Sequence, residues 1–295
     1  MNRVLYRVLS ILFLCSLPLL GHSMPTLVGA DWVKQRLGDP RIILIDMSSG
    51  KGPYQGRFIP GAVELPYSAL VQRNGKGVSL RVSDQRLHEV LGILGIDANR
   101  HVVIYDEMGG LHAGRLYWEL ERIGHTKVSV LDGGIVEWMR RGLPIERQPA
   151  SPEQTTYQAN GGGRENEADL HVVKKAMGDG KTVLLDVRSE HEYRGMQGQG
   201  RSGHIPGAQW WPWEQVLQAE KGLVAKDEST ILASLKGIGV TTDMPVIAYC
   251  RSGHRASRTY LTLRRLGFEN VKLYDGSMAE WSKDGSAPVK PGMQP

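Results

Sequence analysis

A single cysteine, Cys250, stands directly after an apolar run and directly before a basic loop. The loop contains two arginines, Arg251 and Arg255, together with Gly253 and His254. Loop N–H groups, the positive end of a following helix and the two guanidinium groups all favour a thiolate at the cysteine. A thiolate is a nucleophile, and the same donors would hold an anionic adduct on its sulfur while the glycine lets the backbone turn tightly. These residues therefore predict nucleophilic catalysis at Cys250.

The spacing between the cysteine and the second arginine separates two chemistries. Cysteine phosphatases have one more residue before their arginine, which makes a loop sized for the oxygens of a phosphate. Here Ala256 stands at that place and Arg255 comes one residue earlier. The shorter loop favours a pocket for a sulfur atom, and it disfavours phosphatase or arsenate reductase activity.

Short segments on either side must position this loop. Residues 246–249 form an apolar run typical of a buried strand, and Ala256, Tyr260 and Leu263 then recur with helical spacing. Gly267 supplies a residue that commonly ends such a helix. The loop is therefore predicted to lie in a strand-to-helix turn at the carboxyl edge of a sheet, where open α/β folds bind ligands.

The chain contains this pattern twice. Residues 42–62 match residues 183–208, and residues 102–138 match residues 246–281, in the same order in both halves. Each half alternates short apolar runs with amphipathic helical patterns, which predicts an α/β fold with a mainly parallel sheet flanked by helices. A repeat of this length indicates a duplicated domain and not a solenoid.

Composition and the repeat together divide the chain into four predicted segments. Residues 1–23 are predicted to be a signal peptide, and residues 26–147 and 169–291 to be two domains. Residues 148–168, which are mostly polar and contain prolines and consecutive glycines, are predicted to be a linker.

The amino-terminal segment has the three parts of a secretory signal. Arg3 and Arg7 give it a basic start, an apolar run follows, and small residues precede Met24. The run is shorter than the about 20 residues of a membrane-spanning helix, so a retained anchor is the less favoured alternative. Cleavage would remove Cys15 and leave Cys250 without a partner for a disulfide within the chain. We therefore expect a periplasmic protein that is free of the membrane.

The composition is that of a soluble globular protein, with 295 residues of which 41% are hydrophobic. The formal net charge of +5 arises from basic residues scattered among acidic ones, without the runs that are typical of nucleic-acid binding. We therefore expect no nucleic-acid partner, whereas a small anionic substrate is compatible with the charge.

Four short motifs occur together: Asp-Val-Arg at 186–188, Gly-His-Ile-Pro-Gly-Ala at 203–208, Cys-Arg-Ser-Gly-His-Arg at 250–255 and Tyr-Asp-Gly-Ser at 274–277. In this combination the sequence resembles the rhodanese sulfurtransferases, and specifically their tandem two-domain type. The resemblance implies two rhodanese-like domains and a cysteine that attacks the outer sulfur of a donor such as thiosulfate and expels sulfite. The persulfide formed at Cys250 would pass its sulfur to cyanide or a thiol, with no metal or organic cofactor.

The resemblance also suggests the residues that bind the donor. Arg188 lies just beyond a predicted strand, where its guanidinium would bind the oxyanion end of a small anionic donor. The other predicted substrate-binding residues belong to the loop itself: Arg251, Ser252, Gly253, His254 and Arg255. No residue is predicted to bind a metal.

The first half departs from this pattern at one decisive position, because Asp106 stands where Cys250 stands in the second. A carboxylate cannot accept a sulfur atom, and it would oppose an anion in its loop. We therefore expect the first domain to be inactive, with Asp106 bonded to N–H groups of its own loop. In tandem members of the family the first domain packs on the second and helps to form the cleft.

The identity of the donor rests on the residue after the cysteine. Thiosulfate enzymes tend to have a basic residue there, as Arg251 is, whereas mercaptopyruvate enzymes usually carry Cys-Gly-Ser-Gly. The sequence thus favours a thiosulfate sulfurtransferase, with a 3-mercaptopyruvate sulfurtransferase as the alternative enzyme. A non-enzymatic persulfide carrier is the alternative of another class. The sequence does not fix the oligomeric state, and a monomer is our expectation.

Overall fold

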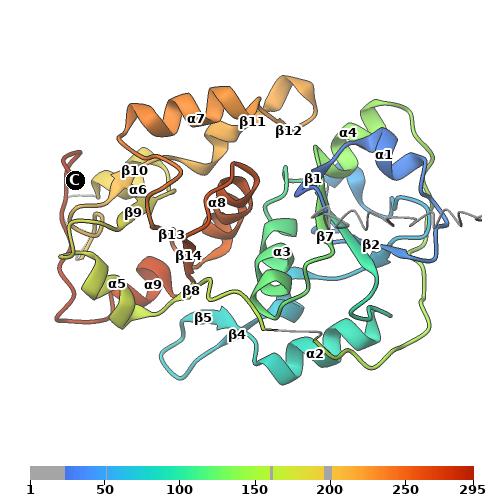
Figure 1. The fold of residues 1–295 in the computed structure, drawn as a ribbon, viewed down its shortest axis with the longest axis horizontal. Helices are drawn as coiled ribbons and strands as arrows, with labels where there is room; N and C mark the ends of the chain where they lie inside the picture. The colour runs from blue at the N-terminus through green and yellow to red at the C-terminus, as the bar shows by residue number, and fades with distance from the viewer. Residues whose placement is uncertain (1–23, 51, 160–161, 196–200) are drawn as a thin grey trace, which may run out of the picture.

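The computed structural model of the protein describes residues 24–50, 52–159, 162–195 and 201–295. The predicted signal peptide, residues 1–23, lies outside these ranges. The described chain forms two α/β halves, each built on a five-stranded sheet whose neighbouring strands are all parallel (Figure 1). This confirms the predicted fold class.

The two sheets have the same strand order. In the first sheet the neighbouring strands are, in spatial order, β1 (Leu27–Val28), β7 (Val128–Leu131), β6 (His101–Tyr105), β2 (Ile42–Asp46) and β3 (Val63–Glu64). In the second sheet they are β8 (Glu167–Ala168), β14 (Val271–Tyr274), β13 (Val246–Tyr249), β9 (Val183–Asp186) and β10 (Gln209–Trp210). The central strands are almost entirely buried, as parallel strands covered on both faces by helices must be.

Helices cover both faces of each sheet. In the first half, α1 (Ala30–Lys34) and α4 (Gly134–Arg140) contribute to the core on one face, and α2 (Asp84–Ile93) and α3 (Ala113–Arg122) to the core on the other. In the second half, α5 (Leu170–Ala176) and α9 (Ser277–Trp281) lie on one face, and α7 (Glu228–Gly237) and α8 (His254–Arg265) on the other. The short helix α6 (Glu190–Arg194) follows β9.

The two halves meet along α3 and α8, which lie side by side at the centre of the molecule (Figure 1). A single apolar core includes residues of both helices and so continues from one half into the other. Gly114 permits their close approach, because a Cβ atom at this position would lie 2.9 Å from the Cα atom of Arg258. The halves are therefore joined by packed helices and not by the connecting segment alone.

Each half also extends an antiparallel hairpin to the other. The N–H of Arg81, in the hairpin of β4 (Val71–Arg73) and β5 (Ser79–Arg81), donates to Asp275 at 2.6 Å. The N–H of Ala225, in the hairpin of β11 (Leu217–Gln218) and β12 (Val224–Ala225), donates to Asp132 at 2.8 Å. The two contacts are equivalent, so the halves are related by an approximate twofold arrangement.

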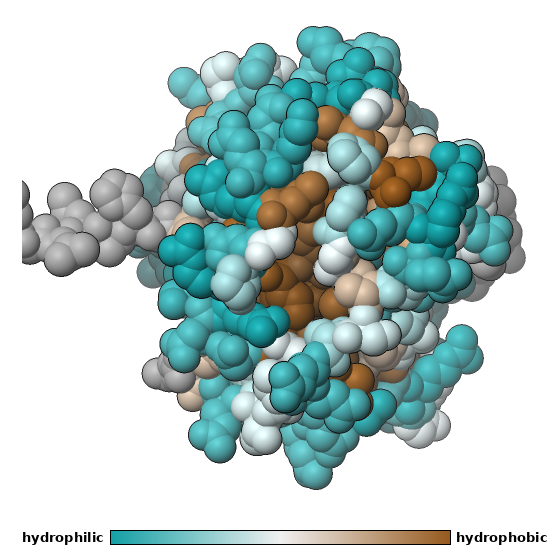
Figure 2. Space-filling view, turned by 90° about the vertical axis from the view of Figure 1, so that its right-hand side faces the viewer, coloured by the Kyte–Doolittle hydropathy of each residue, from teal (hydrophilic) through white to brown (hydrophobic). Residues whose placement is uncertain are grey.

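The remaining helical turns are short 3-10 helices: η1 (Gly52–Tyr54), η2 (Tyr67–Leu70), η3 (Trp213–Val216) and η4 (Ala219–Lys221). The segment predicted to be a linker ends in β8, which pairs with β14. Figure 2 shows the end of the molecule formed by the first half, where hydrophilic side chains surround a central apolar area. Among the residues in the described ranges, no helix is long and apolar enough to cross a membrane.

Candidate active site

Cys250 lies between β13 and α8, in the strand-to-helix turn at the carboxyl edge of the second sheet. It forms no disulfide with any residue that the structure describes, and only 1% of its surface is exposed. Its N–H donates to the hydroxyl of Ser277 at 3.1 Å, and its carbonyl accepts from the N–H of Met278 at 3.1 Å. The turn is therefore held by the start of α9, the helix that follows the neighbouring strand.

Ser277 holds this turn in a second place as well. Its hydroxyl accepts from the N–H of Gly253 at 3.1 Å and donates to the carbonyl of Tyr274 at 2.7 Å. The φ angle of Ser277 is +48°, a left-handed conformation that non-glycine residues rarely adopt and that concentrates at functional sites. Ser277 belongs to the Tyr-Asp-Gly-Ser motif but was not predicted as a site residue. The matching position of the first half is Gly134, and this difference between the halves is the signal that the sequence offered.

The turn offers N–H donors that the chain does not use. The backbone N–H groups of Ser252, His254 and Arg255 have no acceptor in the described part of the chain. They belong to the turn and to the amino-terminal end of α8, which carries partial positive charge. Donors of this kind beside a nucleophile can bind the negative charge that develops on it.

In the first half, Asp106 accepts hydrogen bonds from the N–H groups of the equivalent turn. Its Oδ1 accepts from the N–H groups of Met108 and Gly110, both at 2.8 Å, and the side chain is buried. Its Oδ2 accepts from the N–H groups of His112 and Ala113 at 2.7 and 2.9 Å. The predicted bonding of Asp106 to its own loop is thereby confirmed, and the turn of the first half already contains its anion.

Arg255 is paired within the protein. Its two terminal nitrogens donate to the carboxylate of Glu192 at 2.6 and 2.8 Å. Burial alone would raise the pKa of Glu192, but the hydrogen bonds from Arg255 lower it to about 2. Burial opposes the charge of Arg255, yet Glu192 and the neighbouring Cys250 raise its pKa. Arg255 therefore lies near the thiol as a fixed positive charge, with its terminal nitrogens engaged by a carboxylate.

Glu192 was not predicted as a site residue. Its spacing from Ser189 is that of a capping box, which the structure forms at the start of α6. The sequence signalled this local role, whereas the ion pair with Arg255 joins residues from distant parts of the chain.

Arg188 is also held by a carboxylate. Its Nη2 donates to Asp186 at 2.6 Å and to the carbonyl of Gly203 at 2.8 Å, and its Nε donates to Asp186 at 2.9 Å. Nη1 has no hydrogen-bond partner in the described ranges. The guanidinium is thus oriented by two of its nitrogens, and a third remains for a ligand.

A basic pocket brings Arg188 and Arg251 together. Its volume of about 450 Å³ lies in the range of small-molecule sites. Four cationic side chains line it: Arg188, Arg201, Arg251 and Lys283. Arg251 is exposed and has no ion-pair partner in the described part of the chain, and Gly77 of the first half closes one side. The predicted residues Cys250, Ser252, Gly253, His254 and Arg255 do not line this pocket.

His254 lies at the contact between the halves. Its ring stacks on that of His112 with 4.9 Å between centroids and an interplanar angle of 6°, and its centroid is 4.2 Å from that of Tyr67. Burial, together with His112 and the cations Arg115 and Arg255, lowers the pKa of His254 to about 3. The ring is therefore neutral at ordinary pH and forms part of an aromatic wall.

Gly253 is required by the close approach of a buried carboxylate. Its φ angle is +76°, and a Cβ atom here would lie 2.3 Å from Oδ1 of Asp275. That oxygen accepts from Arg115 of α3 at 2.5 Å, and both side chains of this ion pair are buried. A guanidinium of the first half therefore supports the cysteine turn of the second through Asp275, a contact that the sequence did not reveal.

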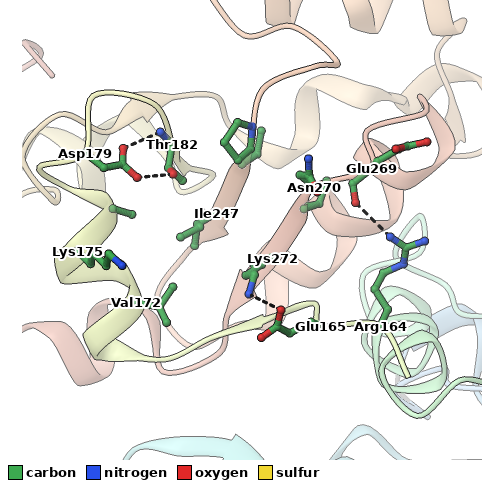
Figure 3. A pocket seen from close by; sticks show the side chains of 14 residues that line it. Arg164, Glu165, Val172, Lys175, Asp179, Thr182, Ile247, Glu269, Asn270 and Lys272 are labelled. Atoms are coloured by element: carbon green, nitrogen blue, oxygen red, sulfur yellow. Dashed lines mark hydrogen bonds and ion pairs between the residues drawn. The ribbon is translucent and has the colours of Figure 1, made fainter. Parts of the chain in front are cut away.

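A further pocket, with a volume of about 420 Å³, lies at the opposite, amino-terminal edge of the second sheet (Figure 3). It is lined by the first residues of β13 and β14 and by α5, and none of its lining residues is a cysteine. It is separate from the turn that contains Cys250.

The geometry defines a duplicated α/β protein in which one of two equivalent turns carries a cysteine, and comparisons with known proteins agree on the fold. The model of the rhodanese-like domain matches residues 29–141 and 169–284. A thiosulfate sulfurtransferase of Azotobacter vinelandii is 31% identical over 271 residues, which cover 91% of this chain and 98% of that protein. The sulfur carrier protein TtuD of Thermus thermophilus is 29% identical over 291 residues, covering 92% and 99%.

A solved structure extends the similarity to three dimensions. The crystal structure of SseA from Escherichia coli, described as a 3-mercaptopyruvate sulfotransferase with the rhodanese fold, has a TM-score of 0.74 and 29% sequence identity. The match covers 86% of this chain and 98% of that one. The chain belongs to the rhodanese family of sulfurtransferases.

Proposed function

We propose that the protein transfers a sulfane sulfur from thiosulfate to a thiophilic acceptor through a persulfide on Cys250. The observation that carries this proposal is the contrast between the two turns. Asp106 fills the N–H donors of its turn with its own carboxylate, whereas Cys250 leaves equivalent donors for an anion that arrives on sulfur.

The chemistry follows from a thiolate at this place. Its Sγ attacks the outer sulfur of thiosulfate, the sulfur–sulfur bond of the donor breaks, and its electron pair leaves with sulfite. The terminal sulfur of the resulting persulfide carries the negative charge, and the N–H groups of Ser252, His254 and Arg255 are available to bind it. Cyanide or a thiolate then attacks that sulfur, the bond to Sγ breaks, and the Cys250 thiolate is restored.

The basic pocket supports an anionic donor. Arg188 and Arg251 line it together and are proposed to bind the oxyanion end of thiosulfate. Arg255 has a different proposed role, because its terminal nitrogens bind Glu192 and leave it to stabilise negative charge at Cys250 from a fixed position. His254 is proposed to shape the wall of the site without exchanging a proton, since its pKa of about 3 keeps it neutral.

The first domain is proposed to be catalytically inactive and to act by support. Asp106 provides no sulfur nucleophile, while Arg115 and the N–H of Arg81 hold Asp275 behind the active turn. We also propose that residues 1–23 direct export and that the protein acts in the periplasm, on the basis of the basic and apolar parts of that segment.

The direct test uses the mature protein with thiosulfate and cyanide. We expect thiocyanate and sulfite in equal amounts, and no turnover by Cys250→Ala. A comparison of kcat/KM for thiosulfate and 3-mercaptopyruvate tests the donor, and a strong preference for mercaptopyruvate would contradict the role given to Arg251. Persistent activity in Cys250→Ala would reject the assignment of the nucleophile.

The similarity to a sulfur carrier protein supports a second candidate, a persulfide carrier. Intact mass after thiosulfate treatment separates the two functions. A carrier would gain one sulfur atom and retain it in the presence of cyanide, whereas the enzyme would return to its original mass.

A further inference from the structure

The pocket at the amino-terminal edge of the second sheet has an internal template in the first half. Its apolar lining includes Val172 and Ala176 of α5 together with Pro245 and Ile247. Figure 3 labels Val172 and Ile247. The volume of about 420 Å³ lies within the range of small-molecule sites. Nothing in the sulfur-transfer reaction uses this edge, which lies at the other end of the strands from Cys250.

Strand register fixes the residues that correspond between the halves. Val102 pairs with Ile43 in the first half, and Val246 pairs with Val183 in the second. Val102 and Val246 therefore occupy equivalent positions. The helices α1 and α5 follow Gly29 and Asp169 as their capping residues. Counting from these points, the positions equivalent to Val172, Ala176 and Pro245 are Trp32, Arg36 and His101.

In the first half these three side chains fill the corresponding place. The ring of Trp32 packs edge-on against His101 with 5.4 Å between centroids, and it also packs against the adjoining apolar core. The guanidinium carbon of Arg36 lies 4.2 Å from the centroid of the Trp32 ring. An indole between an imidazole and a guanidinium therefore occupies the space that remains open in the second half.

All three replacements in the second half are smaller. Valine stands for tryptophan, alanine for arginine and proline for histidine, while Val33 and Val173 preserve the buried contact of the helix with the core. The backbone scaffold is thus retained while an aromatic ring and its neighbours are missing. The open space therefore corresponds to the place where the first half holds an indole ring.

The rim of the pocket adds positive charge that the chain leaves weakly paired. Lys175 has no ion-pair partner in the described ranges, and Figure 3 shows its ammonium directed toward Val172 and Ile247. Lys272 is 3.7 Å from Glu165, whose side chain is 94% exposed, so this pair is weak.

The acidic residues of the rim compete little for this charge. The carboxylate of Asp179 accepts from the N–H groups of Lys181 and Thr182 and from the hydroxyl of Thr182. The carboxylate of Glu269 is turned away from Ile247 in Figure 3. An anionic group on a ligand would therefore meet the ammonium of Lys175 or Lys272.

We propose that this pocket binds a planar aromatic ring system of about the size of indole that carries a carboxylate. The ring occupies the place that Trp32 fills in the first half, over Ile247 and between α5 and the ends of the strands. The carboxylate faces Lys175 and Lys272. The site is independent of Cys250 and of the proposed sulfur transfer.

The test measures binding of indole-3-acetate and of neutral 3-methylindole by calorimetry and ligand-observed NMR. Val172→Trp supplies the ring covalently, and we expect it to weaken binding of both probes at least about tenfold. Lys175→Glu should weaken indole-3-acetate at least about fivefold more than 3-methylindole. Cys250→Ala, the matched control, should bind both probes as the unaltered protein does.

A reciprocal variant makes the test stricter. Trp32→Val opens the equivalent place in the first half, so the stoichiometry for 3-methylindole should rise from about one to about two per chain. The proposal is overturned if the unaltered protein binds neither probe at millimolar concentration, or if Val172→Trp binds them with unchanged affinity. Equal losses for the two probes in Lys175→Glu would refute the role of the lysine.

Discussion

The two strand-to-helix turns share a scaffold but treat negative charge differently. In the first, the carboxylate of Asp106 accepts four backbone N–H groups and the turn is complete within the chain. In the second, Cys250 is equally buried, and N–H groups of its turn have no acceptor in the described residues. The first turn therefore binds a carboxylate of its own chain, whereas the second leaves donors for another anion, which in the proposed reaction is the persulfide.

The corners that support these turns differ in the same direction. Ser277 binds the Cys250 turn through its hydroxyl, whereas Gly134 occupies the equivalent corner of the first half. The Arg115–Asp275 ion pair stands behind the active turn at 2.5 Å. Its counterpart Arg258 donates instead to the carbonyl of Gly109, and burial, only partly offset by acidic neighbours, lowers its pKa to about 10. Stronger polar support thus accompanies the turn that must keep unpaired donors in place.

Cys250→Asp gives the second turn the residue of the first and should have the largest effect. The carboxylate would accept the free N–H groups, so we expect kcat/KM to fall at least about a thousandfold while the fold is retained. Urea unfolding should show Cys250→Asp to be at least as stable as Cys250→Ala. A less stable aspartate variant would mean that the donors do not converge on position 250.

Asp106→Ala tests the comparison from the other side. Removing the carboxylate leaves the four buried or half-buried N–H groups without an acceptor, which we expect to reduce the free energy of unfolding by about 3 kcal/mol. The activity of the folded fraction should stay within about twofold, because no step of the proposed reaction uses this turn. Asp106→Asn keeps one acceptor oxygen, so its free energy of unfolding should lie between those of Asp106→Ala and the unaltered protein. Unchanged stability in both variants would show that these hydrogen bonds contribute little.

The sequence predicted the fold because both halves have the same alternation of strand and helix patterns, with the same spacing of apolar residues. It also predicted that Asp106 binds its own loop, since a carboxylate at that place has N–H donors within reach. Both inferences depend on local sequence patterns, because apolar periodicity indicates strands and helices and turn residues bind the backbone close to them in the chain.

The rest of the site depends on contacts between segments that are distant along the chain. Glu192 pairs with Arg255, and Arg115 pairs with Asp275, only after both domains have folded and packed. Neither pair has a spacing that a sequence pattern could reveal. Arg255 was predicted to bind substrate because its charge was visible, whereas its carboxylate partner was not.

Ser277→Gly gives the Cys250 turn the glycine that occupies the equivalent corner of the Asp106 turn. Losing the hydroxyl frees two N–H groups of the turn, so we expect the rate of sulfite release to fall about tenfold. Glycine also relieves the strain of the positive φ angle of +48° that serine adopts, which offsets the loss in stability.

Ser277→Ala is the control, because it lacks the hydroxyl and keeps the strain. It should be about 1 kcal/mol less stable than Ser277→Gly in urea unfolding, with a similar rate. Equal stability of the two variants would exclude strain at this corner.

The smallest expected effect concerns His254, whose neighbours are His112, Tyr67 and the cations Arg115 and Arg255. Burial lowers its pKa to about 3, whereas an unfolded histidine titrates near 6.5. Below about pH 6.5 the unfolded chain therefore takes up a proton that the folded chain does not, and stability falls with pH. His254→Gln removes this term, so the unaltered protein should lose about 1 kcal/mol more than the variant between about pH 7 and 5.5. Urea unfolding at both pH values measures the difference.

In the first half His101 is the matched control, because burial lowers its pKa to about 4 far from the Cys250 turn. His101→Gln should reduce acid sensitivity in the same way without changing sulfur transfer, and an identical pH response of His254→Gln and the unaltered protein would place a charged histidine in the active turn.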